Sequence, residues 1–248
     1  MTYIAVSALS HPGLVRDRNE DSLVVGPWTL CATATENPQT LVFPLGTPLV
    51  VAVADGLGGH PGGEVASALV VRRLASTGPV LTNEEDVRDA LHACNREVYA
   101  AADDNGDGPA TMGTTVAGAV ILPRSLLAFN VGDSRVFAAP RDGLIQVSVD
   151  DNPPLAPGQR TTSVVTQSLG GTSEYRAVAP HVTAAPLAPG DRFLICTDGL
   201  TDPLPNHVLD ELLREYDDGR AAFELWKAAI AAGGPDNITL ALARIAEE

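Results

Sequence analysis

Short apolar runs, each adjoining an aspartate beside a glycine, serine or asparagine, constrain the fold of this chain more than any other feature. The aspartates and their runs are Asp55 after 49–54, Asp133 after 126–132, Asp198 after 193–197, and Asp236 before 238–242. Runs of this length, rich in valine, isoleucine and leucine, predict buried strands. Carboxylates at strand ends can converge at one rim of a sheet, where they repel one another unless a cation neutralises them. The pattern therefore predicts a hard divalent metal centre.

Size and charge narrow the class of protein. A chain of 248 residues can bury a substantial core as one domain. Its net charge of −15 repels phosphate backbones and anionic membranes, so neither nucleic acid nor a membrane is expected as a partner. The first residues show no signal peptide, and the three scattered cysteines form no zinc or disulfide pattern. We therefore expect a cytoplasmic protein.

The order of the expected elements favours an α+β fold. Strands come in blocks, and helices come in pairs, at 63–74 with a partner starting at the capping-box pattern Thr82-x-x-Glu85, and at 208–216 with 220–232. The polar connection 26–48 could contain a hairpin.

The available ligands identify the kind of metal. Carboxylates, a backbone carbonyl and water form the shell that Mg²⁺ or Mn²⁺ prefers, and no pair of histidines has zinc-ligand spacing. Two such ions bridged by one aspartate could hold a water, lower its pKa and direct it at a phosphoryl group. A single Asp-Gly pair, by contrast, reads as an ordinary turn.

Six segments together resemble the bacterial type of the metal-dependent Ser/Thr protein phosphatase family, PP2C or PPM. They are Arg16–Asp21, Asp55–His60, Gly113–Thr115, Gly132–Arg135, Thr197–Leu200 and Pro235–Asn237. The resemblance implies a four-layer α/β/β/α sandwich, in which two antiparallel sheets are flanked by helix pairs. It also implies one phosphatase domain over residues 1–248, with a short flap-like insertion at about 148–162.

The resemblance further implies a catalytic set. Asp55 bridges two metal ions, and the carbonyl of Gly56 lies on one of them. Asp198 and Asp236 complete the shell of the first ion. Arg16 binds the substrate phosphate, a role that suits its planar, permanently charged guanidinium. Taken apart from its motif, the same residue would be interpreted as an ordinary surface arginine.

Supporting roles follow from the same segments. Glu20 holds the second ion, mostly through water, and Asp21 supports it. Asp133, together with Asp198 and with Asp202 as a further candidate, matches a weaker third metal site. Asn237 is expected behind the first ligands, supporting Asp236 or the waters on the metals.

Two points leave alternatives open. Asp133 could instead be structural, pairing with Arg135 or capping a turn. Leu57 occupies the position where animal members carry a histidine proposed as the general acid, so the source of the leaving-group proton is open.

The expected function is hydrolysis of phosphoserine and phosphothreonine in proteins by a metal-activated water at a binuclear Mg/Mn centre. The substrates are expected to be phosphoproteins of a Ser/Thr kinase signalling pathway, and the enzyme to be a monomer. One alternative is a relative dedicated to a single phosphoprotein. The other is a degenerate phosphopeptide-binding module of the same fold, which the complete set Asp55, Asp198 and Asp236 argues against.

Overall fold

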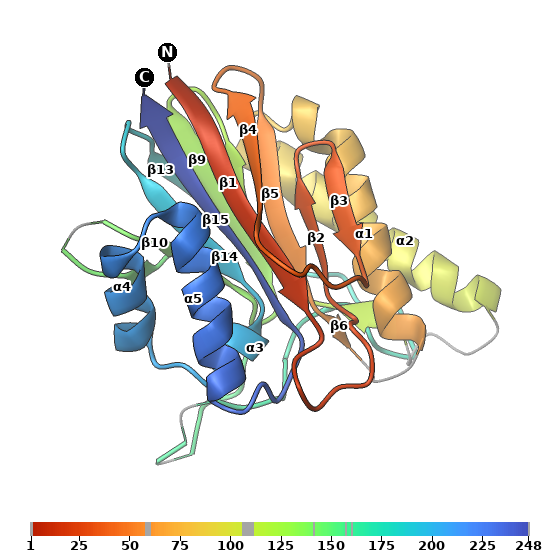
Figure 1. Cartoon of the computed structure of the whole chain (residues 1–248). Coiled ribbons are helices and arrows are strands. Elements are labelled where there is room, and N and C mark those ends of the chain that lie inside the picture. The colour runs from red at the N-terminus through yellow and green to blue at the C-terminus, as the bar shows by residue number, and fades with distance from the viewer. Residues whose placement is uncertain are drawn as a thin grey trace.

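Two six-stranded antiparallel sheets stack at the centre of the molecule (Figure 1). The computed structural model describes residues 2–57, 61–105, 112–140, 142–156, 158–159 and 161–247. The first sheet has the order β11 (Ile145–Gln146), β10 (Arg135–Ala138), β14 (Arg192–Cys196), β15 (Ile238–Glu247), β1 (Thr2–His11), β4 (Gln39–Pro44). The second has the order β13 (His181–Pro186), β9 (Ser125–Val131), β8 (Val116–Ile121), β5 (Leu49–Ala54), β2 (Ser22–Val25), β3 (Trp28–Cys31). A three-stranded sheet joins β12 (Leu169–Gly170), β7 (Gly113–Thr114) and β6 (Gly56–Leu57).

Helices cover the outer face of each large sheet. The second sheet carries α1 (Pro61–Thr77), the 3₁₀ turn η1 (Gly78–Val80) and α2 (Glu84–Asn105). The first sheet carries α3 (Asp198–Thr201), α4 (Asn206–Glu215) and α5 (Asp218–Ala231). Figure 1 shows the two groups on opposite sides of the strands. The predicted four-layer sandwich is confirmed.

Alternation along the strands explains the layering. In β5, Val51 and Val53 pack between the two sheets, whereas Val50 and Ala52 pack against α1 and α2. All six residues of this strand are buried, because both faces of the sheet are covered. The apolar run therefore contributes to two cores at once.

Strand register brings segments from near the start and near the end of the sequence together at one rim of the sandwich, away from the paired chain termini. Strand β1 pairs with β15 along its whole length, from Thr2 opposite Glu247 to His11 opposite Ile238. The loop that follows β1 therefore lies beside the loop that precedes β15. In the second sheet Ser22 pairs with Ala54, which places the residues on either side of this pair at the same rim.

Two local predictions are wrong. The connection 26–48 contains no hairpin, because β3 pairs with β2 in one sheet and β4 pairs with β1 in the other. Strand β3 folds back on the preceding strand β2, whereas β4 joins the other sheet beside β1, so β3 and β4 do not pair with each other. The capping box is also displaced by one residue: Asn83 Oδ1 accepts from the backbone N–H of Glu85 and Asp86, and Asp86 Oδ2 accepts from Thr82.

The predicted flap contains no helix or strand among its described residues. Residues 157 and 160 of this segment lie outside the described part of the chain, as do Gly58, Gly59 and His60 of the second motif. None of the described helices is long and apolar enough to cross a bilayer.

Candidate metal centre

A cleft of about 490 Å³ opens where the two large sheets end. Its lining includes most of the residues singled out in the sequence: Arg16, Glu20, Asp55, Gly56, Leu57, Asp133, Asp198, Asp236 and Asn237. Asp55 enters at the end of β5 in the second sheet, whereas Asp198 follows β14 and Asp236 precedes β15 in the first. The structure therefore brings carboxylates from both sheets to one rim.

The backbone around Asp55 is held by the third motif. Its carbonyl oxygen accepts from the Thr114 hydroxyl at 2.7 Å and from the Thr115 N–H at 2.9 Å. Gly56 follows in β6 and pairs with Thr114. This motif therefore fixes the chain direction at Asp55 and Gly56.

The buried carboxylates strongly perturb one another. Burial, followed by the nearby charges of Asp21 and Asp198, raises the pKa of Asp55 well above its usual value. Burial and the charge of Asp133 raise the pKa of Asp198 to about 7. Burial likewise raises the pKa of Asp21 to about 7, against hydrogen bonds from hydroxyl groups that lower it. A shared cation would relieve this cost.

Unpartnered oxygen atoms provide a test of whether a metal fits. The Oδ1 atoms of Asp21 and Asp198 are buried and have no hydrogen-bond partner. Within the described ranges, no three His, Cys, Asp or Glu side chains are already arranged as a closed metal shell. The oxygen-only donor set nevertheless fits Mg²⁺ or Mn²⁺, since buried carboxylate oxygens without hydrogen-bond donors are what such ions bind.

Arg16 lies at the mouth of the cleft. Its guanidinium donates to Asp236 Oδ2 at 2.7 Å, and about half of its side chain is exposed. This hydrogen bond raises the pKa of the arginine. An exposed fork held over the carboxylates is placed to meet an incoming anion.

Asn237 fastens the loop that carries Arg16 and Glu20. Its Oδ1 accepts from the Glu20 N–H at 2.7 Å, and its Nδ2 donates to the carbonyls of Pro12 and Arg18 at 2.9 and 2.8 Å. The predicted supporting position is therefore occupied. Its side chain contacts the backbone of the 12–20 loop, and its backbone N–H donates to Asp236 Oδ1 at 2.8 Å.

Two glycines allow this close packing. Gly13 has a φ of +80°, and a Cβ there would lie 2.2 Å from the Asp236 carbonyl oxygen. A Cβ on Gly199 would lie 1.9 Å from the carbonyl oxygen of Asn237. Any side chain at either position would push the loop before β15 away from the cleft.

Asp133 is 6% exposed and accepts a hydrogen bond from Asn152 Nδ2 at 3.0 Å. Burial raises its pKa. Arg135 pairs with Asp150 at 2.7 Å and not with Asp133, which removes one of the structural alternatives. A cavity of about 240 Å³ beside the cleft is lined by Asp133, Asp198 and Asp202, the residues expected at a third metal site.

Comparison with known proteins identifies the family. The model of the protein phosphatase 2C family matches residues 42–235. The chain belongs to the protein phosphatase 2C family.

Several bacterial phosphatases are similar to this PP2C chain. It is 31% identical over 97% of its length to the serine/threonine protein phosphatase PstP of Mycobacterium tuberculosis, and it spans 45% of that protein. It is 30% identical to the Listeria monocytogenes serine/threonine phosphatase stp, covering 78% of this chain and 83% of the relative. The crystal structure of the PstP catalytic domain in complex with two manganese ions superposes with a TM-score of 0.80, at 29% identity and full coverage of both chains.

Motif reading missed a chain of hydroxyl groups beneath the PP2C cleft. Asn19 Nδ2 donates to Ser10 Oγ at 2.8 Å, and Ser10 is 2.7 Å from Thr239 Oγ1. Thr197 Oγ1 donates to Asp21 Oδ2 at 2.9 Å and accepts from the Thr239 N–H at 3.1 Å. These groups tie Asp21 to the ends of β1, β14 and β15. Of the four residues that lead to Asp21, Asn19 and Thr197 lie within the six segments, which gave them no role, and Ser10 and Thr239 lie outside them.

Proposed function

We propose that this chain hydrolyses phosphoserine and phosphothreonine in proteins, with Mn²⁺ or Mg²⁺ as cofactor. The observation that carries the proposal is the convergence of Asp55, Asp198 and Asp236 in one cleft, with Arg16 above them. PP2C membership and the two manganese ions bound in the PstP structure support it. The complete carboxylate set argues against a module that only binds phosphopeptides.

Each residue of the metal site has a defined role in this proposal. Asp55, Asp198 and Asp236 would hold the first ion. Asp55 and Glu20, with Asp21 in support, would hold the second, and the carbonyl of Gly56 would lie on one of the two. When bound, the ions activate a water for in-line attack on phosphorus and neutralise charge on the phosphoryl oxygens. Attack by water needs no serine or cysteine nucleophile.

Arg16 orients the substrate. Its fork exchanges the Asp236 carboxylate for two phosphate oxygens, a geometry for which a guanidinium is suited. Leu57 lines the same cleft and carries no proton for the departing serine or threonine oxygen. Phosphate esters with acidic leaving groups should therefore react fastest.

The proposal also covers the domain extent, oligomeric state, location and substrates of the enzyme. Residues 1–248 act as one phosphatase domain, with 148–162 along the rim of the cleft. The enzyme is monomeric and cytoplasmic, and its substrates are phosphoproteins of a Ser/Thr kinase pathway. Asp133 and Asp202 hold a weaker third ion.

Turnover of p-nitrophenyl phosphate and of phosphoserine peptides, with Mn²⁺ and then with excess EDTA, tests the activity. Turnover should require the metal, and Asp198→Asn should lower it by orders of magnitude. Asp210→Asn is a matched control, because Asp210 lies on α4 and pairs with Arg214 outside the cleft. Full activity in EDTA would overturn the metal mechanism. Peptide binding without turnover in the Mn²⁺-loaded protein would favour the binding module.

A further inference from the structure

A second groove of about 560 Å³ continues from the metal cleft. Leu57 and Val165 line both spaces, so the two are contiguous. One wall of the second groove is the segment 165–168, and the other is the loop 170–178. We call this space the side groove.

The small sheet sets the length of the side groove. Leu57 of β6 pairs with Gly113 of β7, and Gly113 pairs with Gly170 of β12. Neighbouring strands lie ~4.8 Å apart, so crossing from β6 to β12 covers roughly 10 Å. An extended peptide spans ~3.3 Å per residue, so about three residues separate the cleft from the far wall.

Arg176 is held in place on that far wall. Its backbone N–H donates to Tyr99 Oη at 3.2 Å, and its carbonyl accepts from Asn95 Nδ2 at 2.8 Å. Asn95 is fully buried on α2, and its Oδ1 also accepts from the Gly170 N–H at 2.9 Å. The loop is therefore fastened to α2 on both sides of an exposed residue.

The guanidinium of Arg176 supplies the charge of the side groove. It is exposed, and it makes no hydrogen bond or ion pair with the described part of the chain. Asp151 is the other charged residue of the lining, and its side chain is 12% exposed. Its oxygens are engaged by His181, the Gly132 N–H and Gln167 at 2.8 to 2.9 Å. The groove thus presents a cation on the surface of a protein with a net charge of −15.

We propose that the side groove binds the substrate polypeptide beyond the phosphoresidue, and that Arg176 binds an acidic side chain about three to five residues away. The inference rests on the proposed function, because it names the substrate class of the same cleft. The recognised group is an anion, which either a carboxylate or a second phosphate can supply. Arg176 is then a specificity-determining residue that acts on substrate binding.

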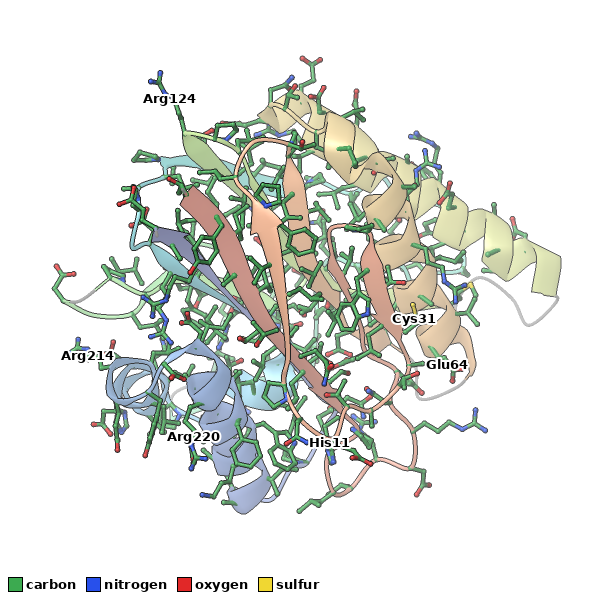
Figure 2. The ribbon with its side chains drawn as sticks, turned by 45° about the horizontal axis from the view of Figure 1, so that its top comes forward. His11, Cys31, Glu64, Arg124, Arg214 and Arg220 are labelled. Carbon is green, nitrogen blue, oxygen red and sulfur yellow. The ribbon has the colours of Figure 1, made fainter. Side chains whose placement is uncertain are left out.

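Phosphoserine peptides in an alanine background test this inference. Each carries glutamate, phosphoserine or alanine at one position three, four or five residues before or after the reacting phosphoserine. The variants are Arg176→Ala, Arg176→Lys and the control Arg124→Ala. Arg124 is also exposed, and Figure 2 shows it at the end of the molecule opposite His11.

At one or more positions, glutamate should raise kcat/KM about fivefold over alanine, as for an exposed charged pair, through a lower KM. The gain should disappear in Arg176→Ala, persist in part in Arg176→Lys, and shrink at high salt. p-Nitrophenyl phosphate turnover should not change. A larger gain for phosphoserine than for glutamate identifies a second phosphate as the preferred anion.

Fluorescence anisotropy with the same peptides and the Asp198→Asn protein, with and without Arg176→Ala, measures binding without turnover. It therefore decides the inference even if the wild-type protein fails to hydrolyse any ester. Equal binding of glutamate, phosphoserine and alanine peptides at all positions would overturn the proposal. A preference that survives Arg176→Ala, or is lost in Arg124→Ala, would also overturn it.

Discussion

Replacing Asn237 by alanine should loosen the entire substrate side of the cleft. The side chain is 5% exposed and makes three hydrogen bonds to the backbone, at Glu20, Pro12 and Arg18. A typical intramolecular hydrogen bond contributes about 1 kcal/mol net, so the variant should lose about 3 kcal/mol of unfolding free energy. That is a large part of the ~5–15 kcal/mol that stabilises a typical domain.

Urea denaturation without metal measures this loss. For a chain of this size, about 3 kcal/mol corresponds to a fall in Tm of roughly 6–12 °C. Because the freed 12–20 loop carries Arg16 and Glu20, turnover of p-nitrophenyl phosphate should fall at temperatures where the variant is still folded. Asn83→Ala is the matched control, since Asn83 caps α2 with two backbone hydrogen bonds away from the cleft. It should cost about 1 kcal/mol and leave turnover unchanged.

The comparison can refute the argument. If Asn237→Ala costs no more than Asn83→Ala and keeps full turnover, the side chain does not hold the loop. Intact turnover together with the full loss of stability would mean that the loop position is irrelevant to catalysis.

Three further outcomes are expected. Arg16→Ala should raise KM, at a cost of about 1.5–3 kcal/mol for a lost charged hydrogen bond, and an unchanged KM in steady-state kinetics would remove Arg16 from the phosphate. Burial raises the pKa of Asp21 and Asp198 to about 7, so the folded metal-free protein holds protons between roughly pH 4 and pH 7 that the unfolded chain has released. Its free energy of unfolding should therefore fall as pH rises through that window, and urea titrations in EDTA that showed a rise would contradict the assignment. Asp133→Ala should lower turnover of phosphopeptides more than that of p-nitrophenyl phosphate, and equal loss on both would point to a structural role.

Local patterns predicted the main elements of the fold. The apolar runs before Asp55 and Asp198 are strands. The helix expected at 63–74 lies within α1, and the one expected at 208–216 corresponds to α4. The segment 26–48 was misread because β3 pairs with the strand just before it, β2, whereas β4 pairs with β1 in the other sheet. Strand partners depend on which faces can be buried together, and turn signals carry no information about that.

The same limit applies to the site. Motifs located the carboxylates, because their residue types and spacing are distinctive. Ser10 and Thr239 had no such signal, since they meet across a register that joins residues 229 positions apart. A lone serine or threonine in a strand looks like any other until the pairing is known. The side-chain contacts of Asn237 were likewise beyond prediction, because their partners are backbone groups of the 12–20 loop.

The origin of the carboxylates has a mechanical consequence. Asp55 comes from one sheet, and Asp198 and Asp236 come from the other, which faces it across an apolar core. An ion shared among them would link the two sheets across the open edge of the sandwich and tether segments that are otherwise held by side-chain packing. Adding Mn²⁺ should then slow amide hydrogen exchange in parallel at the ends of β5 and β15, which share no backbone ladder. Metal binding and the free energy that separates the two sheets are then thermodynamically coupled. Variants that loosen the core between the sheets should therefore also weaken metal binding.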